Sequence, residues 1–264
     1  MYPYDIIPGV SLYVIMICVG IVACFTLFRL LSDKRELDAK IYNLALICGG
    51  VGIVIGLFAA TLFQALYNIA SLGRFEISEN TGATFYGGLI GGALIFLAVY
   101  FSVGRTRAKE QYLKSFFKLL SCIAPSIAVA HGFGRVGCLM AGCCHGRLTD
   151  AWYGITMYGN MGYGKYVPTQ LFEALFLFLL CAILSIRAVK GRSINFSIYI
   201  VAYGIWRFFI EYARADYRGD TFVSFLTPSQ LVAVVLVIVG VALIFVEKYV
   251  GKRISTASEG KPNA

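Results

Sequence analysis

Long apolar runs separated by short polar segments dominate the chain. A helix needs about 20 apolar residues to cross the hydrocarbon core of a bilayer. Seven runs are long enough, which predicts an all-α integral membrane protein with seven transmembrane helices. The runs cover approximately residues 10–31, 43–69, 84–103, 115–141, 168–187, 194–213 and 226–247. Seven spans place the two termini on opposite sides of the membrane.

Basic residues are unevenly divided among the connections. The first, third and fifth connections and the C-terminal tail are rich in lysine and arginine, whereas the second, fourth and sixth are poor in them. Cytoplasmic loops carry the excess of positive charge in membrane proteins. The pattern therefore predicts an outside N-terminus and a cytoplasmic C-terminus, with the connections at about 142–167 and 214–225 facing outward.

Composition agrees with this class. Hydrophobic residues make up 59% of the chain and charged residues 14%, against about 45–50% and about 25% in soluble domains. The net charge of +9 follows the loop pattern and forms no single stripe, so we expect no nucleic-acid partner. We expect one transmembrane domain over residues 1–250 and a disordered cytoplasmic tail over 251–264.

Ionisable residues inside the fourth predicted span are costly to insert and therefore informative. His131, Arg135 and Cys138 follow at i, i+4 and i+7, so they share one helical face. Arg135 has no carboxylate on its own helix, and its partner must come from elsewhere. It either snorkels toward the outer headgroups or binds a lipid phosphate, whose oxygens match the guanidinium fork.

The sixth predicted span carries a second polar face. Tyr203, Arg207, Glu211 and Arg214 follow at i, i+4, i+8 and i+11. Glu211 lies one turn from Arg207 and can pair with it. The face is either a structural ion pair or part of a phosphate site at headgroup depth.

Cys143, Cys144 and His145 follow the fourth span within a glycine-rich segment at 134–147. Cysteine and histidine together raise the question of zinc. We expect no metal, because adjacent cysteines fit tetrahedral ligation poorly and the spacing is not that of a zinc finger. Cys144 and His145 as nucleophile and base remain an alternative.

Tyr86, Gly87 and Gly88 open the third predicted span. The glycines permit close helix packing. Tyr86 can also supply a phenol, as a hydrogen-bond donor or as a base.

These polar clusters and several further short motifs follow one another over most of the chain. They are Tyr13, Tyr86-Gly87-Gly88-Leu89, Ile123-Ala124-Pro125, Gly134-Arg135-Val136-Gly137, Pro168-Thr169-Gln170-Leu171-Phe172-Glu173-Ala174, Tyr203-Gly204 with Arg207, Glu211 and Arg214, and Thr227–Gln230. Together they resemble the prolipoprotein diacylglyceryl transferase family of bacterial inner membranes. Seven spans with the N-terminus outside is also that family's architecture.

The chain departs from the family pattern at several polar positions. Arg135, Gly137 and Gly146 match the signature, but cysteine or alanine stands where the family has asparagine or glutamate, at Cys138, Ala141 and Cys143. Tyr86 takes the place of a histidine, and Ala60 that of an arginine. The sequence resembles a divergent branch that contains Gly-Cys-Cys.

The resemblance implies transfer of a diacylglyceryl group from phosphatidylglycerol to the lipobox cysteine thiol of a preprolipoprotein, at the outer leaflet of the plasma membrane. Arg135, Arg207 and Arg214 are the expected phosphate ligands. The expected catalytic residues are Arg207, Glu211, Tyr86, Tyr203 and His131, and the base is open among Glu211, His131, His145 and Tyr86. Supporting residues are Tyr13, Gly87, Gly88, Gly137, Cys138, Cys143, Cys144, His145, Gly146, Gln170 and Glu173. The expected partners are phosphatidylglycerol, prolipoprotein signal peptides and membrane lipid, with no cofactor.

Two other functions remain open. A catalytic Cys143 or Cys144 favours acyl transfer, because a thioester turns over readily whereas an enzyme thioether is a poor leaving group. The bundle can also bind or move an anionic lipid without chemistry, a reading favoured by the loss of the family's usual polar residues.

Overall fold

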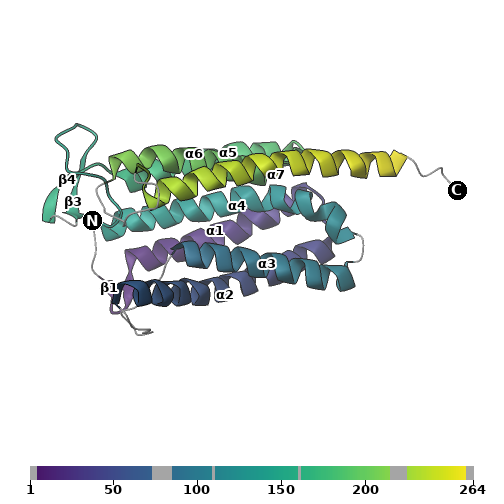
Figure 1. The fold of residues 1–264 in the computed structure, drawn as a ribbon, viewed down its shortest axis with the longest axis horizontal. Helices are drawn as coiled ribbons and strands as arrows, with labels where there is room; N and C mark the ends of the chain where they lie inside the picture. Colours follow the sequence, from purple (N-terminus) through teal and green to yellow (C-terminus); the bar gives the residue numbers. More distant parts are fainter. Residues whose placement is uncertain (1–4, 73–84, 109–110, 160–161, 215–224, 260–264) are drawn as a thin grey trace. The chain divides into compact units, whose positions relative to one another are not determined.

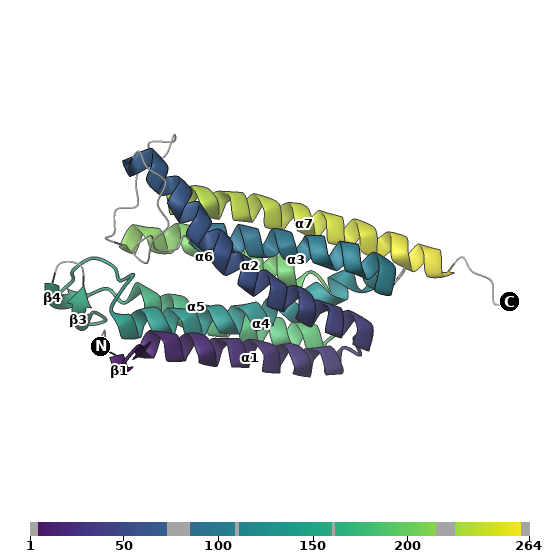
Figure 2. The ribbon, with the colours of Figure 1, turned by 90° about the horizontal axis from the view of Figure 1, so that it is seen from below.

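Seven helices form almost all of the secondary structure in this computed structural model, which describes residues 5–72, 85–108, 111–159, 162–214 and 225–259. The helices are α1 (Leu12–Lys34), α2 (Ala39–Leu72), α3 (Phe85–Arg107), α4 (Gln111–Ala141), α5 (Thr169–Val189), α6 (Asn195–Ile210) and α7 (Pro228–Glu259). A 3-10 turn, Glu211–Ala213, continues α6. Figures 1 and 2 show their course.

Six of these helices are long and apolar enough to cross a membrane, as found among the described residues: α1, α2, α3, α4, α5 and α7. This confirms a multi-pass, all-α membrane protein. Helix α6 has 16 residues and is shorter than the other six. The chain is not entirely helical, because β1 (Asp5–Ile7) pairs with β2 (Val10–Ser11), and β3 (Ile155–Gly159) pairs with β4 (Gly162–Tyr166), both antiparallel. The second hairpin lies in the connection at 142–167, for which sequence analysis predicted no secondary structure.

The chain divides into two compact units, Met1–Arg35 with Leu120–Ala264, and Glu36–Leu119. In the second unit, α2 and α3 pack through small residues. A Cβ added at Gly56 would lie 3.0 Å from the carbonyl oxygen of Gly88, and one added at Gly92 would lie 3.0 Å from that of Gly52. Glycine therefore allows the two backbones to approach closely, as in other membrane helix pairs.

In the first unit, local sequence signals set the helix ends. Ser11 caps α1, with its hydroxyl accepting from the Val14 amide at 3.4 Å. Thr227 and Gln230 form a reciprocal capping box at the start of α7, with distances of 3.1 and 3.2 Å, and Pro228 occupies the first helical position. Gly142 ends α4 with a φ of +70°.

Pro125 lies inside α4 and has no amide proton for the carbonyl of Ser121 one turn earlier. The side-chain amide of Asn195 donates to that carbonyl at 3.4 Å and to the Ser121 hydroxyl at 2.8 Å. The buried polar group that proline creates is thus satisfied from α6.

Five helices of the first unit each have one end in the same region. Contacts join the end of α4, the start of α5, the end of α6 and the start of α7, and α1 begins beside α4. The β3–β4 hairpin lies at this same end (Figure 1). We call this region the polar end of the first unit.

Candidate active site

Glu173 is the central carboxylate of the polar end and is fully buried on α5. The Tyr203 hydroxyl donates to its Oε1 at 2.9 Å. The Nε of Arg135 lies 3.1 Å from the same oxygen, and the Nε2 of His131 lies 4.0 Å from it. Glu173 is therefore the carboxylate that Arg135 lacks on its own helix. The pairing joins α4, α5 and α6.

His131 is also tied to α6, because its Nδ1 lies 3.1 Å from the Tyr199 hydroxyl. Its ring meets that of Tyr203 edge to face, with centroids 4.8 Å apart. His131 thus sits between two tyrosines that lie one helical turn apart.

Arg207 belongs to a second ion-pair group. Its Nη2 lies 2.8 Å from Glu211 Oε2 and donates to the Ser229 hydroxyl at 2.9 Å. The predicted Arg207–Glu211 pair is confirmed. Arg207 is only 5% exposed, and its Nη1 has no hydrogen-bond partner in the part of the chain that the structure describes. A buried donor without a partner is costly, and a ligand oxygen would satisfy it.

Arg214 and Thr227 complete this second group. The Nε of Arg214 lies 3.9 Å from Glu211 Oε2, and the Thr227 hydroxyl donates to Glu211 Oε1 at 3.2 Å. Counting both groups, three arginines face two glutamates, which leaves one positive charge before the thiols are considered. Arginines in such a setting suit a phosphate oxygen.

The start of α5 holds the Cys143-Cys144 turn in place. The Gln170 side chain donates to the Cys143 carbonyl at 2.6 Å, and the Thr169 hydroxyl donates to the Cys144 carbonyl at 2.9 Å. Cys144 has a φ of +61°, a left-handed conformation that is unfavourable for any residue with a Cβ. Strain of this kind concentrates at functional sites.

Gly146 lets this turn pack against the end of α6. Its amide donates to the Val167 carbonyl at 2.8 Å, and it forms an antiparallel bridge with Arg214. A Cβ at this position would lie 2.8 Å from the Val167 Cβ and would also meet the Ala213 carbonyl. The signature glycine is therefore required by close packing.

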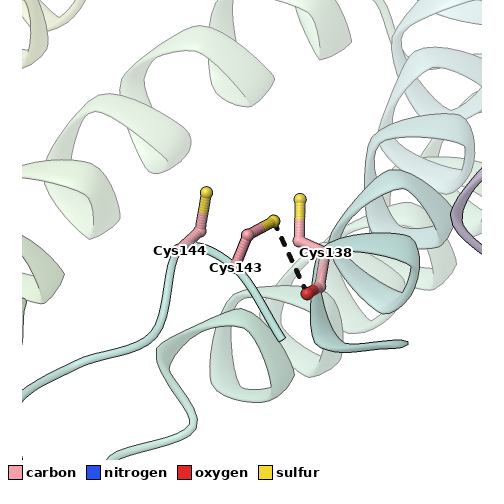
Figure 3. Close-up of side chains that lie close together, drawn as sticks. All are labelled: Cys138, Cys143 and Cys144. Carbon is pink, nitrogen blue, oxygen red and sulfur yellow. Dashed lines mark hydrogen bonds between the residues drawn. The ribbon is translucent and has the colours of Figure 1, made fainter. Parts of the chain in front are cut away.

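The sulfurs of Cys138, Cys143 and Cys144 all lie within 4.8 Å of one another. Figure 3 shows Cys143 turned toward Cys138, whose carbonyl accepts from its thiol at 3.7 Å, while Cys138 and Cys144 extend in the same direction. Interactions with the neighbouring Cys138 and Cys143 thiols hold the pKa of Cys144 below its ordinary value, and Arg214 acts in the same sense. Interactions with the Cys138 and Cys144 thiols, together with burial, raise the pKa of Cys143.

His145 is directed elsewhere. It is buried, its Nδ1 donates to the Gly146 carbonyl at 2.8 Å, and its ring packs on Tyr166 with centroids 4.2 Å apart. Its ring nitrogens are not members of the sulfur group. The arrangement gives little support to Cys144 and His145 as a nucleophile and its base.

Gly137 allows α1 to pack against α4 one residue before Cys138. A Cβ at Gly137 would lie 3.1 Å from the Cδ2 of Tyr13. Tyr13, near the start of α1, therefore lies against the segment at 134–147.

Comparison with known proteins identifies the chain. The sequence model of the family described as prolipoprotein diacylglyceryl transferase matches residues 5–246. The chain belongs to this family. A phosphatidylglycerol–prolipoprotein diacylglyceryl transferase of Clostridium tetani is 33% identical over 248 residues, which cover 90% of this chain and 93% of the relative. A second relative with that name, from Clostridium perfringens, is 32% identical over 91% of this chain and 92% of its own length.

The motif positions 86–88 lie in the second compact unit, Glu36–Leu119. Tyr86 is the second residue of α3, but its side chain lies outside the described residues. A Cβ at Gly88 would lie 3.2 Å from the Ala60 Cβ, and one at Gly87 would lie 2.8 Å from the Phe63 Cγ. These glycines serve helix packing. The catalytic role of Tyr86 stays a prediction.

Sequence analysis assigned no role to three side chains that support the family's arginines and cysteines: Tyr199, Thr169 and Ser229. Tyr199 precedes Tyr203 by one turn, so helical periodicity contains its signal. Thr169 and Ser229 are small hydroxyl residues inside the motifs at 168–174 and 227–230. Nothing in the sequence distinguishes them from ordinary helix-start residues.

Proposed function

We propose that the chain transfers a diacylglyceryl group from phosphatidylglycerol to the lipobox cysteine thiol of preprolipoproteins, forming a thioether and releasing glycerol phosphate. Family membership and the two clostridial relatives of that name support this proposal. The single observation that carries it is the buried Arg207, which is paired with Glu211 and has an Nη1 left for an oxygen ligand.

The arginines act on the departing phosphate. The reaction breaks the bond between a glyceryl carbon and a phosphate oxygen, so negative charge grows on that phosphate. Preorganised cations lower the energy of such a transition state. Arg207 and Arg135 are already fixed by Glu211 and Glu173, and Arg214 lies beside Glu211 as support.

Glu173 has a positioning role in this proposal. It accepts from Tyr203 and pairs with Arg135, so it fixes the direction of that guanidinium. The base that takes the acceptor proton is proposed among His131, Glu211, His145 and Tyr86. His131 has its Nδ1 beside a tyrosine hydroxyl and its Nε2 toward Glu173.

The proposed topology has seven spans in the bacterial inner membrane. Helix α6 and the turn Glu211–Ala213 form the short sixth span, which ends at headgroup depth. The loop charges support an outside N-terminus and a cytoplasmic C-terminus. The polar end then faces the outer leaflet, where phosphatidylglycerol and signal peptides meet it.

The test uses purified protein in nanodiscs, a lipobox peptide and phosphatidylglycerol, followed by mass spectrometry. A diacylglyceryl mass gain on the cysteine peptide is expected, with none on a matched serine peptide and none when phosphatidylethanolamine replaces phosphatidylglycerol. No gain on the cysteine peptide with phosphatidylglycerol would contradict the proposal.

Acyl transfer through an enzyme cysteine is the second candidate. The thiol hydrogen bonds and Arg214 that lower the pKa of Cys144 favour a thiolate there. The same experiment separates the two reactions, because an acyl group adds a smaller mass and its thioester is cleaved by neutral hydroxylamine, whereas a thioether is not.

A further inference from the structure

The Cys138, Cys143 and Cys144 group is not used by the phosphate site. All three residues are partly exposed, and they come from the last turns of α4 and the loop after it. Thr169 and Gln170 fix the backbone of the two adjacent cysteines. The group is thus held by a built scaffold and remains accessible to a ligand.

The spacing objection to a metal does not hold in three dimensions. Adjacent residues in an extended chain point to opposite sides, but the φ of +61° at Cys144 turns the chain, and its sulfur lies with the other two. Zinc–sulfur bonds of about 2.3 Å in a tetrahedron place sulfurs about 3.8 Å apart. The observed limit of 4.8 Å is within about 1 Å of that spacing, which small side-chain rotations cover.

The local charges suit a thiolate-bound ion. Three thiolates and Zn²⁺ carry a net charge of −1 (three negative charges against two positive). Two guanidinium groups interact electrostatically with these thiols, Arg214 with Cys144 and Arg135 with Cys138 and Cys144. The one positive charge by which the three arginines exceed their two glutamates balances this excess negative charge.

The ligand count leaves one position open. Among the described histidine, cysteine, aspartate and glutamate side chains, this group offers three ligand atoms. Zinc sites with three protein ligands keep the fourth position for water or substrate, whereas structural sites are closed by four. The substrate of the proposed function carries a thiol, which is a preferred zinc ligand.

We infer that Cys138, Cys143 and Cys144 bind one Zn²⁺ ion and that the acceptor thiol of the transfer reaction occupies its fourth position. The second part rests on the proposed function. Coordination releases the acceptor's proton to water and leaves a zinc-bound thiolate. That sulfur forms a bond to the glyceryl carbon, the carbon–oxygen bond breaks, and glycerol phosphate leaves with the electron pair. The thioether product is a poor zinc ligand and dissociates.

The first experiment measures metal binding alone, on reduced full-length protein in nanodiscs. Zinc content is determined by mass spectrometry, and Co²⁺ is titrated while the sulfur-to-cobalt charge-transfer absorption is followed. We expect one ion per chain. C138S, C143S and C144S should each weaken binding by about tenfold or more. The matched control is C18S, which makes the same change at an exposed cysteine of α1 and should bind like the native chain.

The second experiment adds a lipobox peptide to the Co²⁺-loaded protein. The cysteine peptide should increase the charge-transfer absorption by about one third, because a fourth sulfur joins three, and a serine peptide should leave it unchanged. Diacylglyceryl transfer is then measured in metal-free and Zn²⁺-loaded protein.

The outcomes separate the two proposals. Three results would overturn the zinc site. They are no metal binding, metal binding that none of the three substitutions affects, and a disulfide among these cysteines in the protein as isolated. Zinc bound without any response to the cysteine peptide, or transfer at an equal rate without metal, overturns the acceptor role. Zinc bound with the cobalt response but no transfer supports the site and overturns the proposed function.

Discussion

Arg135 and Glu173 lie on different helices, and their side chains meet at 3.1 Å inside the polar end of the first unit. Glu173 is fully buried, and Tyr203 donates to the same oxygen. The pair therefore ties α4 to α5 and α6 and fixes one of the two arginines proposed to bind phosphate.

Removal of the Glu173 carboxylate should destabilise the fold strongly. Breaking a buried ion pair costs about 3–5 kcal/mol, because the remaining charge is left without a partner. We expect E173A to lower the free energy of unfolding by about that amount, measured by denaturant unfolding in detergent. The matched control is D33A, which breaks the exposed pair between Arg29 and Asp33 at 3.0 Å. Exposed pairs contribute about 0–1 kcal/mol, so equal losses in the two variants would contradict the account.

Arg207 should not be replaceable by lysine. The guanidinium of Arg207 binds Glu211 and Ser229 through Nη2, and its other nitrogens can donate to the substrate. The ammonium of lysine has a single nitrogen and cannot donate in both directions with the same geometry. We expect R207K to reduce kcat/KM for diacylglyceryl transfer by about 100-fold. R192A removes an exposed charge in the connection between α5 and α6 and should retain native activity. Native activity in R207K would remove Arg207 from the proposed mechanism.

Gly146 should tolerate no side chain. An alanine Cβ would meet Val167 and the Ala213 carbonyl, so the Cys143-Cys144 turn must shift. Overpacking of this kind costs about 1–3 kcal/mol. We expect G146A to lose that stability and most of its Co²⁺ affinity. G49A changes a helical glycine with open space around it and should be neutral or slightly stabilising. Unchanged unfolding and cobalt titration curves in G146A would show that this packing is not needed.

Thr169 should position the Cys144 backbone without touching substrate. T169V keeps the shape and removes the hydroxyl that donates to the Cys144 carbonyl. A lost buried hydrogen bond costs about 1–3 kcal/mol. We expect a cobalt affinity at least about tenfold weaker, with a normal maximal absorption when the site is saturated. T149V makes the same change at the hydroxyl that accepts from the Ala151 amide and should leave cobalt affinity unchanged. An equal effect of both variants would argue for a general structural loss.

Apolar runs were sufficient for the six helices that qualify as membrane spans among the described residues, and helical spacing was sufficient for the Arg207–Glu211 pair. Apolar runs determine where spans form, and residues one turn apart on a helix are neighbours by geometry. The fifth predicted span, about 168–187, matches Thr169–Val189 to within two residues. The β3–β4 hairpin was not predicted, because short strands in a polar connection have no long apolar pattern.

Contacts between helices were beyond the sequence pattern. The sequence indicated that Arg135 needs a carboxylate from elsewhere, and the motif around Gln170 contained Glu173, but only packing of α4 against α5 joins them. The three sulfurs of Cys138, Cys143 and Cys144 also could not be placed from the sequence. Linear spacing argued against a metal, and the left-handed backbone at Cys144 brings the three sulfurs together.

The two arginine groups are proposed to serve diacylglyceryl transfer. The most direct measurement is the ratio of glycerol phosphate released to diacylglyceryl peptide formed, followed together over time for the native protein and R207A. We expect equal amounts of the two products in the native protein and neither product above background in R207A. Glycerol phosphate without modified peptide, or equal product from both proteins, would contradict it.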